Sequence, residues 1–220
     1  MDIDKLIAQK PQLHLDENGS PVDYSINVAV LKALNNYLKP GMHTLETGSG
    51  HSTIVFAMIG TNHISISPYA DEQIRIKKYL EDNGIGNSTK FLNGSSDVIL
   101  ATAPEIPAVL DFVLIDGAHR FPFACIDFHY TEQRIPVDGI FCLDDVHMPS
   151  VRILYKFLLK EKEWELVQKV KNTAFFKRVL PTIIYADWQG QEMNSAFKKL
   201  SALKGKISKP IKKMLKMTRS

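Results

Sequence analysis

Acidic residues stand at the ends of three apolar segments of this chain, at positions where they could do chemistry. They are Glu46, Asp116 and the adjacent pair Asp144 and Asp145. Because the carboxyl ends of parallel strands meet at one edge of a sheet, we expect these carboxylates to gather above one crevice. Like charges at that distance repel unless something cationic lies among them. Carboxylate oxygens suit a hard divalent cation such as Mg²⁺ or Mn²⁺, so the cluster is a candidate metal site.

The first of these acids also opens a turn with two closely spaced glycines. Gly48 and Gly50 permit a tight turn and let a ligand approach the backbone, since neither residue has a Cβ atom. The free N–H groups of the helix that follows would then face the crevice. An acid directly before the turn favours a ligand that carries a positive charge. The candidate binding residues of this segment are Glu46, Gly48, Ser49, Gly50, Ser52 and Thr53.

Strand-like and helix-like segments alternate along the chain, and this alternation predicts an α/β fold. The residues 111–116 are apolar on both faces, as expected of a central parallel strand. The other expected strands are 43–47, 63–67, 90–92 and 140–145, and a hairpin is expected from 164–170 and 174–179. The expected helices are 25–38, 69–83, 122–134 and 150–162, with Pro149 at the start of the last.

This arrangement resembles the class I S-adenosylmethionine-dependent methyltransferases over roughly residues 25–180. The resemblance implies a Rossmann-like, doubly wound, mostly parallel seven-stranded sheet with a C-terminal antiparallel hairpin. It also implies that the turn after Glu46 wraps the methionine end of S-adenosylmethionine. The family usually has an acid that grips the ribose after the second strand, and Ser67 stands there instead. Ser95 stands near the position expected to face the adenine, and Asp116 is a further candidate contact.

The segment from Leu114 to His119, followed by Leu143 to Asp145, is similar to the metal-dependent O-methyltransferases that act on catechols and sugar hydroxyls. The resemblance implies that Asp116, Asp144 and Asp145 hold Mg²⁺, or Mn²⁺, and that His119 is the general base. His147 competes for that role. Two residues of the helix after His119, Asp127 and His129, are expected to be second-sphere or surface groups.

The predicted function is therefore methyl transfer to a hydroxyl of a sugar or other polar metabolite, with a small-molecule or glycan acceptor. Because Ser67 and Ser95 depart from the family pattern, two alternatives stay open. One is a metal-independent methyltransferase with the same fold. The other is a cofactor-binding or scaffold protein whose catalytic site has decayed.

Length and composition place the chain among ordinary globular proteins, since 220 residues with 45% apolar content can bury a sizeable core. No apolar run approaches the roughly 18 residues needed to span a bilayer. The acidic start of the chain has no apolar signal segment. Cys125 and Cys142 lie in apolar contexts and are expected to be reduced core residues, which indicates a cytoplasmic protein.

Charge is distributed unevenly, and this suggests a separate C-terminal element. Residues 195–220 contain nine Lys or Arg and no acid, leaving 18 basic against 24 acidic residues in the rest. Apolar residues recur among the lysines at helical spacing, so we expect peripheral contact with an anionic membrane at its cytoplasmic face. Nucleic acid is a less expected partner, because the tail lacks spaced aromatics. The expected organisation is an extension over 1–24, the methyltransferase domain over 25–190 and a basic tail over 191–220.

Overall fold

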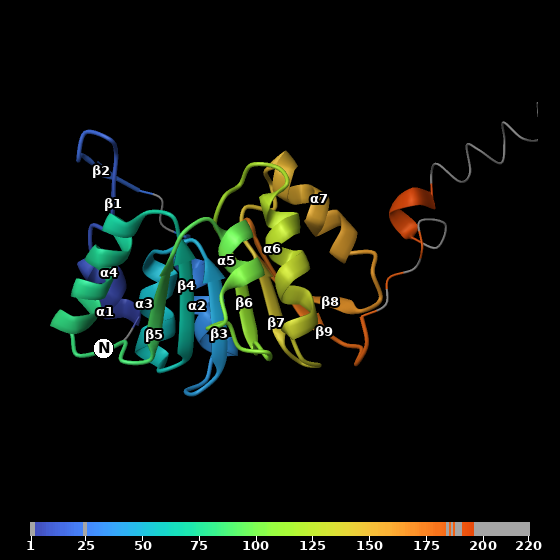
Figure 1. Cartoon of the computed structure of the whole chain (residues 1–220), viewed down its shortest axis with the longest axis horizontal. Coiled ribbons are helices and arrows are strands. Elements are labelled where there is room, and N and C mark those ends of the chain that lie inside the picture. The colour runs from blue at the N-terminus through green and yellow to red at the C-terminus, as the bar shows by residue number, and fades with distance from the viewer. Residues whose placement is uncertain (1–2, 24–25, 184, 186, 188–190, 196–220) are drawn as a thin grey trace, which may run out of the picture.

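A seven-stranded sheet forms the centre of the molecule (Figure 1), in the order β5-β4-β3-β6-β7-β9-β8. The computed structural model describes residues 3–23, 26–183, 185, 187 and 191–195. The strands are β3 (His43–Thr47), β4 (Asn62–Ser67), β5 (Thr89–Asn93), β6 (Phe112–Ile115), β7 (Ile140–Leu143), β8 (Trp164–Val170) and β9 (Thr173–Arg178). All neighbours from β5 to β7 pair in parallel, whereas β9 pairs antiparallel with both β7 and β8. The predicted fold class is confirmed, including the terminal hairpin.

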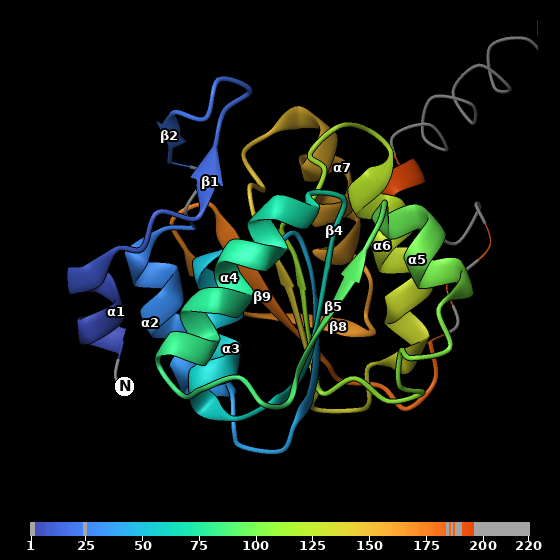
Figure 2. The ribbon, with the colours of Figure 1, turned by 60° about the vertical axis from the view of Figure 1, so that its left-hand side comes forward.

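Helices cover both faces of the sheet, as the view in Figure 2 shows. Leu34, Phe56 and Ile76 bring α2, α3 and α4 into one apolar core, and Leu6 adds α1 to it. On the opposite face α5, α6 and α7 pack into a second core. The helices are α1 (Ile3–Gln9), α2 (Val28–Tyr37), α3 (His51–Ile59), α4 (Ala70–Asp82), α5 (Ser96–Thr102), α6 (Phe123–Thr131) and α7 (Pro149–Leu158), with the 3₁₀ turns Glu132–Arg134 and Glu192–Asn194.

The central strands follow from their residue types. Every residue of β6 and β7 is buried and apolar, so these strands can lie only between two helical layers. The outermost strand β8 instead alternates charged and apolar residues and has a register shift between Leu166 and Gln168. Charges and irregular pairing of this kind discourage an edge strand from pairing with another chain.

The N-terminal segment adds two features that the sequence did not predict. Helix α1 precedes a small antiparallel hairpin of β1 (His14–Leu15) and β2 (Pro21–Val22). The hairpin lies beside the N-terminal ends of α3 and α4, and two contacts to α4 hold it there. Arg75 donates to the Leu13 carbonyl at 2.6 Å, and His14 pairs with Glu72 at 3.0 Å. Within the segment itself, Lys10 pairs with Asp23 at 2.6 Å.

Both cysteines are free, and Cys142 is buried in β7 as expected. Within the described part of the chain, no helix is both long and apolar enough to cross a membrane. The basic tail predicted over 191–220 lies outside the described residues from position 196 onward.

Candidate active site

The turn between β3 and α3 is held against the end of β6 by close backbone contacts. Gly48 has φ +93°, and a Cβ atom there would lie 2.6 Å from the carbonyl oxygen of Asp116. Its N–H donates to the Ile66 carbonyl at 2.8 Å, and the Asp116 N–H donates to the Thr47 carbonyl at 3.0 Å. Glycine is therefore required at position 48 by the close approach of two strand ends, in addition to any ligand.

The other residues of the turn make internal contacts as well. The Ser49 and Ser65 hydroxyls lie 2.7 Å apart, and the Gly50 N–H donates to the Thr53 hydroxyl at 2.9 Å. A Cβ atom on Gly50 would lie 3.3 Å from Nε2 of His14. The N-terminal hairpin thus closes over the side of the turn where the sequence predicts ligand contact.

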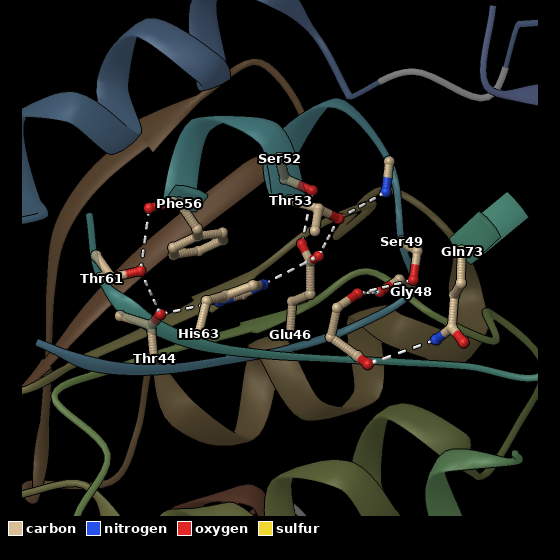
Figure 3. Close-up of polar contacts among 12 residues, drawn as sticks. Thr44, Glu46, Gly48, Ser49, Ser52, Thr53, Phe56, Thr61, His63 and Gln73 are labelled. Carbon is tan, nitrogen blue, oxygen red and sulfur yellow. Dashed lines mark hydrogen bonds and ion pairs between the residues drawn. The ribbon is translucent and has the colours of Figure 1, made fainter. Parts of the chain in front are cut away.

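The carboxylate of Glu46 points into the protein and is only 1% exposed. Ser52 donates to its Oε2 at 2.7 Å, and the Thr53 hydroxyl donates to Oε1 in a short contact. Nε2 of His63, on β4, lies 3.2 Å from the same Oε1 (Figure 3). Three of the predicted binding residues, Glu46, Ser52 and Thr53, therefore form a buried cluster behind the turn.

The two serines predicted to face the adenosine also take part in local turns. The Ser67 hydroxyl accepts the Tyr69 N–H at 3.2 Å, and its carbonyl accepts the Gly94 N–H at 3.0 Å. The Ser95 hydroxyl donates to Asp97. The structure places both serines at the carboxyl ends of β4 and β5, in the loops that a cofactor bound along this edge would meet.

The second cluster consists of acids around one imidazole. Nε2 of His119 lies 3.5 Å from Oδ1 of Asp116 and 3.5 Å from Oδ2 of Asp145. Asp145, which has φ +51°, also lies 3.4 Å from Nδ1 of His147. The acids after β6 and β7 thus lie around His119, whereas Glu46, predicted to join them, is held in the separate buried cluster behind the turn.

The charges of this cluster shift two pKa values upward. Burial raises the pKa of Asp116 to about 8, against the opposing effect of its hydrogen bond to His119, and the nearby Asp144 adds to the rise. Hydrogen bonding to Asp116 raises the pKa of His119, against the opposing effect of burial. Both shifts favour the protonated form of each group.

The predicted metal ligands do not gather around a common point. Asp144 is buried, and its Oδ1 accepts the hydroxyl of Thr173 from β9. The imidazole of His119 occupies the space between Asp116 and Asp145. Among the described residues, no group of three or more His, Cys, Asp or Glu side chains is placed to hold a metal ion. The donor set of this structure therefore does not fit Mg²⁺.

Two residues that sequence reasoning missed fix the loops of His119 and His147 to α7. The Ser150 hydroxyl donates to the carbonyl of His119, and Arg152 donates to the carbonyl of His147 at 2.6 Å. Both residues lie in the first turn of α7, directly after Pro149. A polar residue at the start of a helix is a weak sequence signal for such a contact. The roles of Ser150 and Arg152 could have been found only by knowing which loops meet at α7.

Asp127 and His129 of α6, predicted to be second-sphere or surface groups, differ in their exposure to solvent. His129 is mostly exposed, with Glu132 at 3.9 Å. Asp127 is fully buried, and it faces Thr47 and Ser96 from beneath the cofactor loops. Burial raises the pKa of Asp127 to about 6, and hydrogen bonds to Ser96 and Thr47 oppose the rise.

A small cavity of about 110 Å³ lies between the N-terminal hairpin and the first residue of α3. His51 lines it and is only 6% exposed, and neither ring nitrogen has a well-aligned hydrogen-bond partner. Burial and the nearby His14 lower the pKa of His51, against opposing effects of Asp23 and the Pro11 carbonyl. His51 follows Gly50 directly, so the cavity lies next to the turn.

The sheet order, with β9 inserted antiparallel beside β7, and the turn after β3 define a Rossmann-like methyltransferase fold. The sequence from residue 45 to residue 146 matches the family model of a methyltransferase domain. The matched stretch is a little under half of the chain, and it includes the turn after β3 and the ends of β6 and β7.

Solved structures with this fold share little sequence with the chain. TomG, an O-methyltransferase from Streptomyces achromogenes involved in tomaymycin synthesis, was solved with S-adenosylmethionine; it has a TM-score of 0.64 at 18% identity, covering 80% of this chain and 90% of its own. Cofactor-bound Rv0187 from MTB has a TM-score of 0.63 at 14% identity, with coverages of 80% and 88%. A protein provisionally named a caffeoyl-CoA O-methyltransferase, from Staphylococcus aureus, has a TM-score of 0.59 at 17% identity, covering 81% of this chain and 92% of its own. No curated protein matches the chain.

Proposed function

We propose that this protein transfers the methyl group of S-adenosylmethionine to a hydroxyl oxygen of a sugar or another polar metabolite. The observation that carries the proposal is the imidazole of His119, set between two carboxylates at the edge of the sheet. The cofactor turn touches the same place, because Gly48 packs against the backbone of Asp116. A base and a cofactor-binding turn within one crevice suit transfer to a group that must lose a proton.

The cofactor supplies an electrophilic methyl group on its sulfonium. A hydroxyl is a poor nucleophile until its proton is removed, and His119 can take that proton only when its imidazole is neutral, so its raised pKa makes deprotonation of the ring a requirement of the mechanism. Asp116 and Asp145 hold the His119 ring in place and stabilise the positive charge that it gains. The rest of the site needs to align oxygen, methyl carbon and sulfur, which is the effect of holding the reactants in a fixed geometry.

The proposed cofactor contacts are the backbone of the turn at 48–50 and the loops that carry Ser67 and Ser95. Phe121, two residues after His119, is 63% exposed. Beside it, the guanidinium of Arg120 lies 4.5 Å from the ring centre of Phe123. An exposed aromatic ring and a cation next to the base suit a polar ring compound such as a sugar, whose apolar face can stack on an aromatic ring.

Metal assistance is the part of the sequence prediction that the geometry supports least, since the imidazole of His119 lies between Asp116 and Asp145, two of the residues that would hold the ion. We therefore favour direct proton transfer to His119. We further propose a cytoplasmic location, with the tail of residues 191–220 touching anionic membranes.

The test is methyl transfer from labelled S-adenosylmethionine to nucleotide sugars and glycolipids. Activity should persist in EDTA, and His119→Ala should lower turnover by roughly 10²–10⁴-fold while S-adenosylhomocysteine binds as before. His129→Gln, on an exposed face of α6, is the matched control and should have wild-type turnover. Loss of activity in EDTA that Mg²⁺ restores would favour the metal-assisted mechanism. Cofactor binding without any transfer would favour a decayed site.

A further inference from the structure

A line of buried polar side chains runs from the C-terminal end of α3 to the cofactor turn (Figure 3). The Thr61 hydroxyl lies 3.1 Å from the Phe56 carbonyl and 3.0 Å from the Thr44 hydroxyl. The Thr44 hydroxyl in turn lies 2.9 Å from Nδ1 of His63. His63 has no exposed surface, and its ring stacks on Phe56 with ring centres 4.2 Å apart.

The directions of these hydrogen bonds decide where the protons lie. A carbonyl can only accept, so the Thr61 hydroxyl donates to Phe56 and must accept from Thr44. The Thr44 hydroxyl has then used its proton and must accept from Nδ1 of His63. Nδ1 therefore carries a proton in the only arrangement that satisfies all three contacts.

The other ring nitrogen faces a carboxylate. Nε2 of His63 lies 3.2 Å from Oε1 of Glu46, at an angle outside that of a good hydrogen bond. With Nδ1 already protonated, a neutral ring would turn the lone pair of Nε2 toward this anion. A second proton on the ring removes that repulsion and gives two buried charges opposite partners, which buried charges require.

We propose that His63 is a positioning residue for the cofactor turn, acting as the buried cation that neutralises Glu46. Both oxygens of Glu46 are occupied from inside, by Ser52 on one and by Thr53 and His63 on the other. Thr53 in turn accepts the N–H of Gly50, so the pair fixes the turn from behind. Glu46 thus acts on the cofactor through the shape of the turn, and its charge is balanced within the protein.

A double-mutant cycle tests this inference, with S-adenosylhomocysteine affinity measured by calorimetry. The probe rests on the proposed function, and failure of the wild type to bind it would count against that function. Glu46→Gln and His63→Gln should each weaken binding at least tenfold, because each leaves one buried charge without its partner. The double variant should regain most of the loss, since both charges are gone. The control His129→Gln replaces an exposed histidine and should bind S-adenosylhomocysteine like the wild type.

Two results would overturn the inference. Equal weakening by Glu46→Gln and by the double variant would show that Glu46 meets the cofactor directly. Unchanged binding by His63→Gln would show that the turn needs no buried cation. Should a single variant fail to fold, nitrogen NMR of wild-type His63 at neutral pH decides independently of any ligand. Protons on both ring nitrogens support the ion pair, and a neutral ring refutes it.

Discussion

Replacement of Gly48 by alanine separates two reasons for a glycine in the cofactor turn. Gly48 and Gly60, at the two ends of α3, have φ values of +93° and +82°. A Cβ atom at Gly60 would meet nothing within 4 Å, whereas at Gly48 it would lie 2.6 Å from the Asp116 carbonyl oxygen. Gly60→Ala is therefore the matched control, because it introduces backbone strain without a collision.

The expected loss for Gly60→Ala is about 1–2 kcal/mol, the cost of a left-handed backbone for an alanine. Gly48→Ala carries a similar strain and adds an overpacking cost of about 1–3 kcal/mol. The neighbour cannot retreat cheaply, since the N–H of Asp116 is bonded to the Thr47 carbonyl at 3.0 Å. Gly48→Ala should thus lose about 2 kcal/mol more than Gly60→Ala.

Urea unfolding of both variants measures this difference from the midpoints at unchanged slope. Gly48→Ala should also bind S-adenosylhomocysteine more weakly, because either the turn or the backbone of Asp116 must move. Equal losses of stability in the two variants would refute the collision and leave Gly48 with the roles predicted from sequence, a tight turn and the approach of a ligand.

Two further predictions concern charge. Burial raises the pKa of Asp127 from 3.8 to about 6, so ionisation of this group should lower wild-type stability by about 3 kcal/mol as pH rises from 3 to 7. Asp127→Asn should lack this decline in urea unfolding across the same pH range, and identical slopes in the two proteins would contradict the shift. Removal of residues 195–220 should weaken binding to anionic liposomes, each lysine near the surface adding about 1 kcal/mol. Equal binding of full-length and shortened protein at low salt would rule out the tail as an anchor.

The architecture could be predicted because its determinants are local. The runs that became β6 and β7 are apolar on both faces, and the hairpin of β8 and β9 was found within a residue or two of its bounds. Helix α5 was missed because its seven residues begin in the polar turn at Ser95 and Ser96, whose composition indicated a loop. The β1 and β2 strands of two residues each carry too little pattern to detect.

The site could be predicted only in part, because it depends on which strands become neighbours. The acids after β3, β6 and β7 were found from their positions at strand ends. The partner of Glu46, His63, was not predicted. The two side chains meet only because the register of β3 and β4 sets His63 opposite Thr44, two residues before Glu46. A signal existed in the polar residues at alternate positions of β4, His63, Ser65 and Ser67, which a buried strand contains only when each has a partner.

The insertion of β9 between β7 and β8 has a consequence for how the protein is made. The methyltransferase match ends at residue 146, yet the outer side of β7 acquires its partner only when residues 173–178 have been synthesised. Until then one edge of β7, the wholly apolar strand Ile140–Leu143, has no hydrogen-bonding partner. Unpaired apolar strands of this kind promote aggregation with other chains. Asp144 also lacks its hydrogen-bond donor until β9 has been synthesised, because that donor, Thr173, is the first residue of β9. The nascent chain therefore completes its sheet and fixes this part of its active-site edge in a single late step.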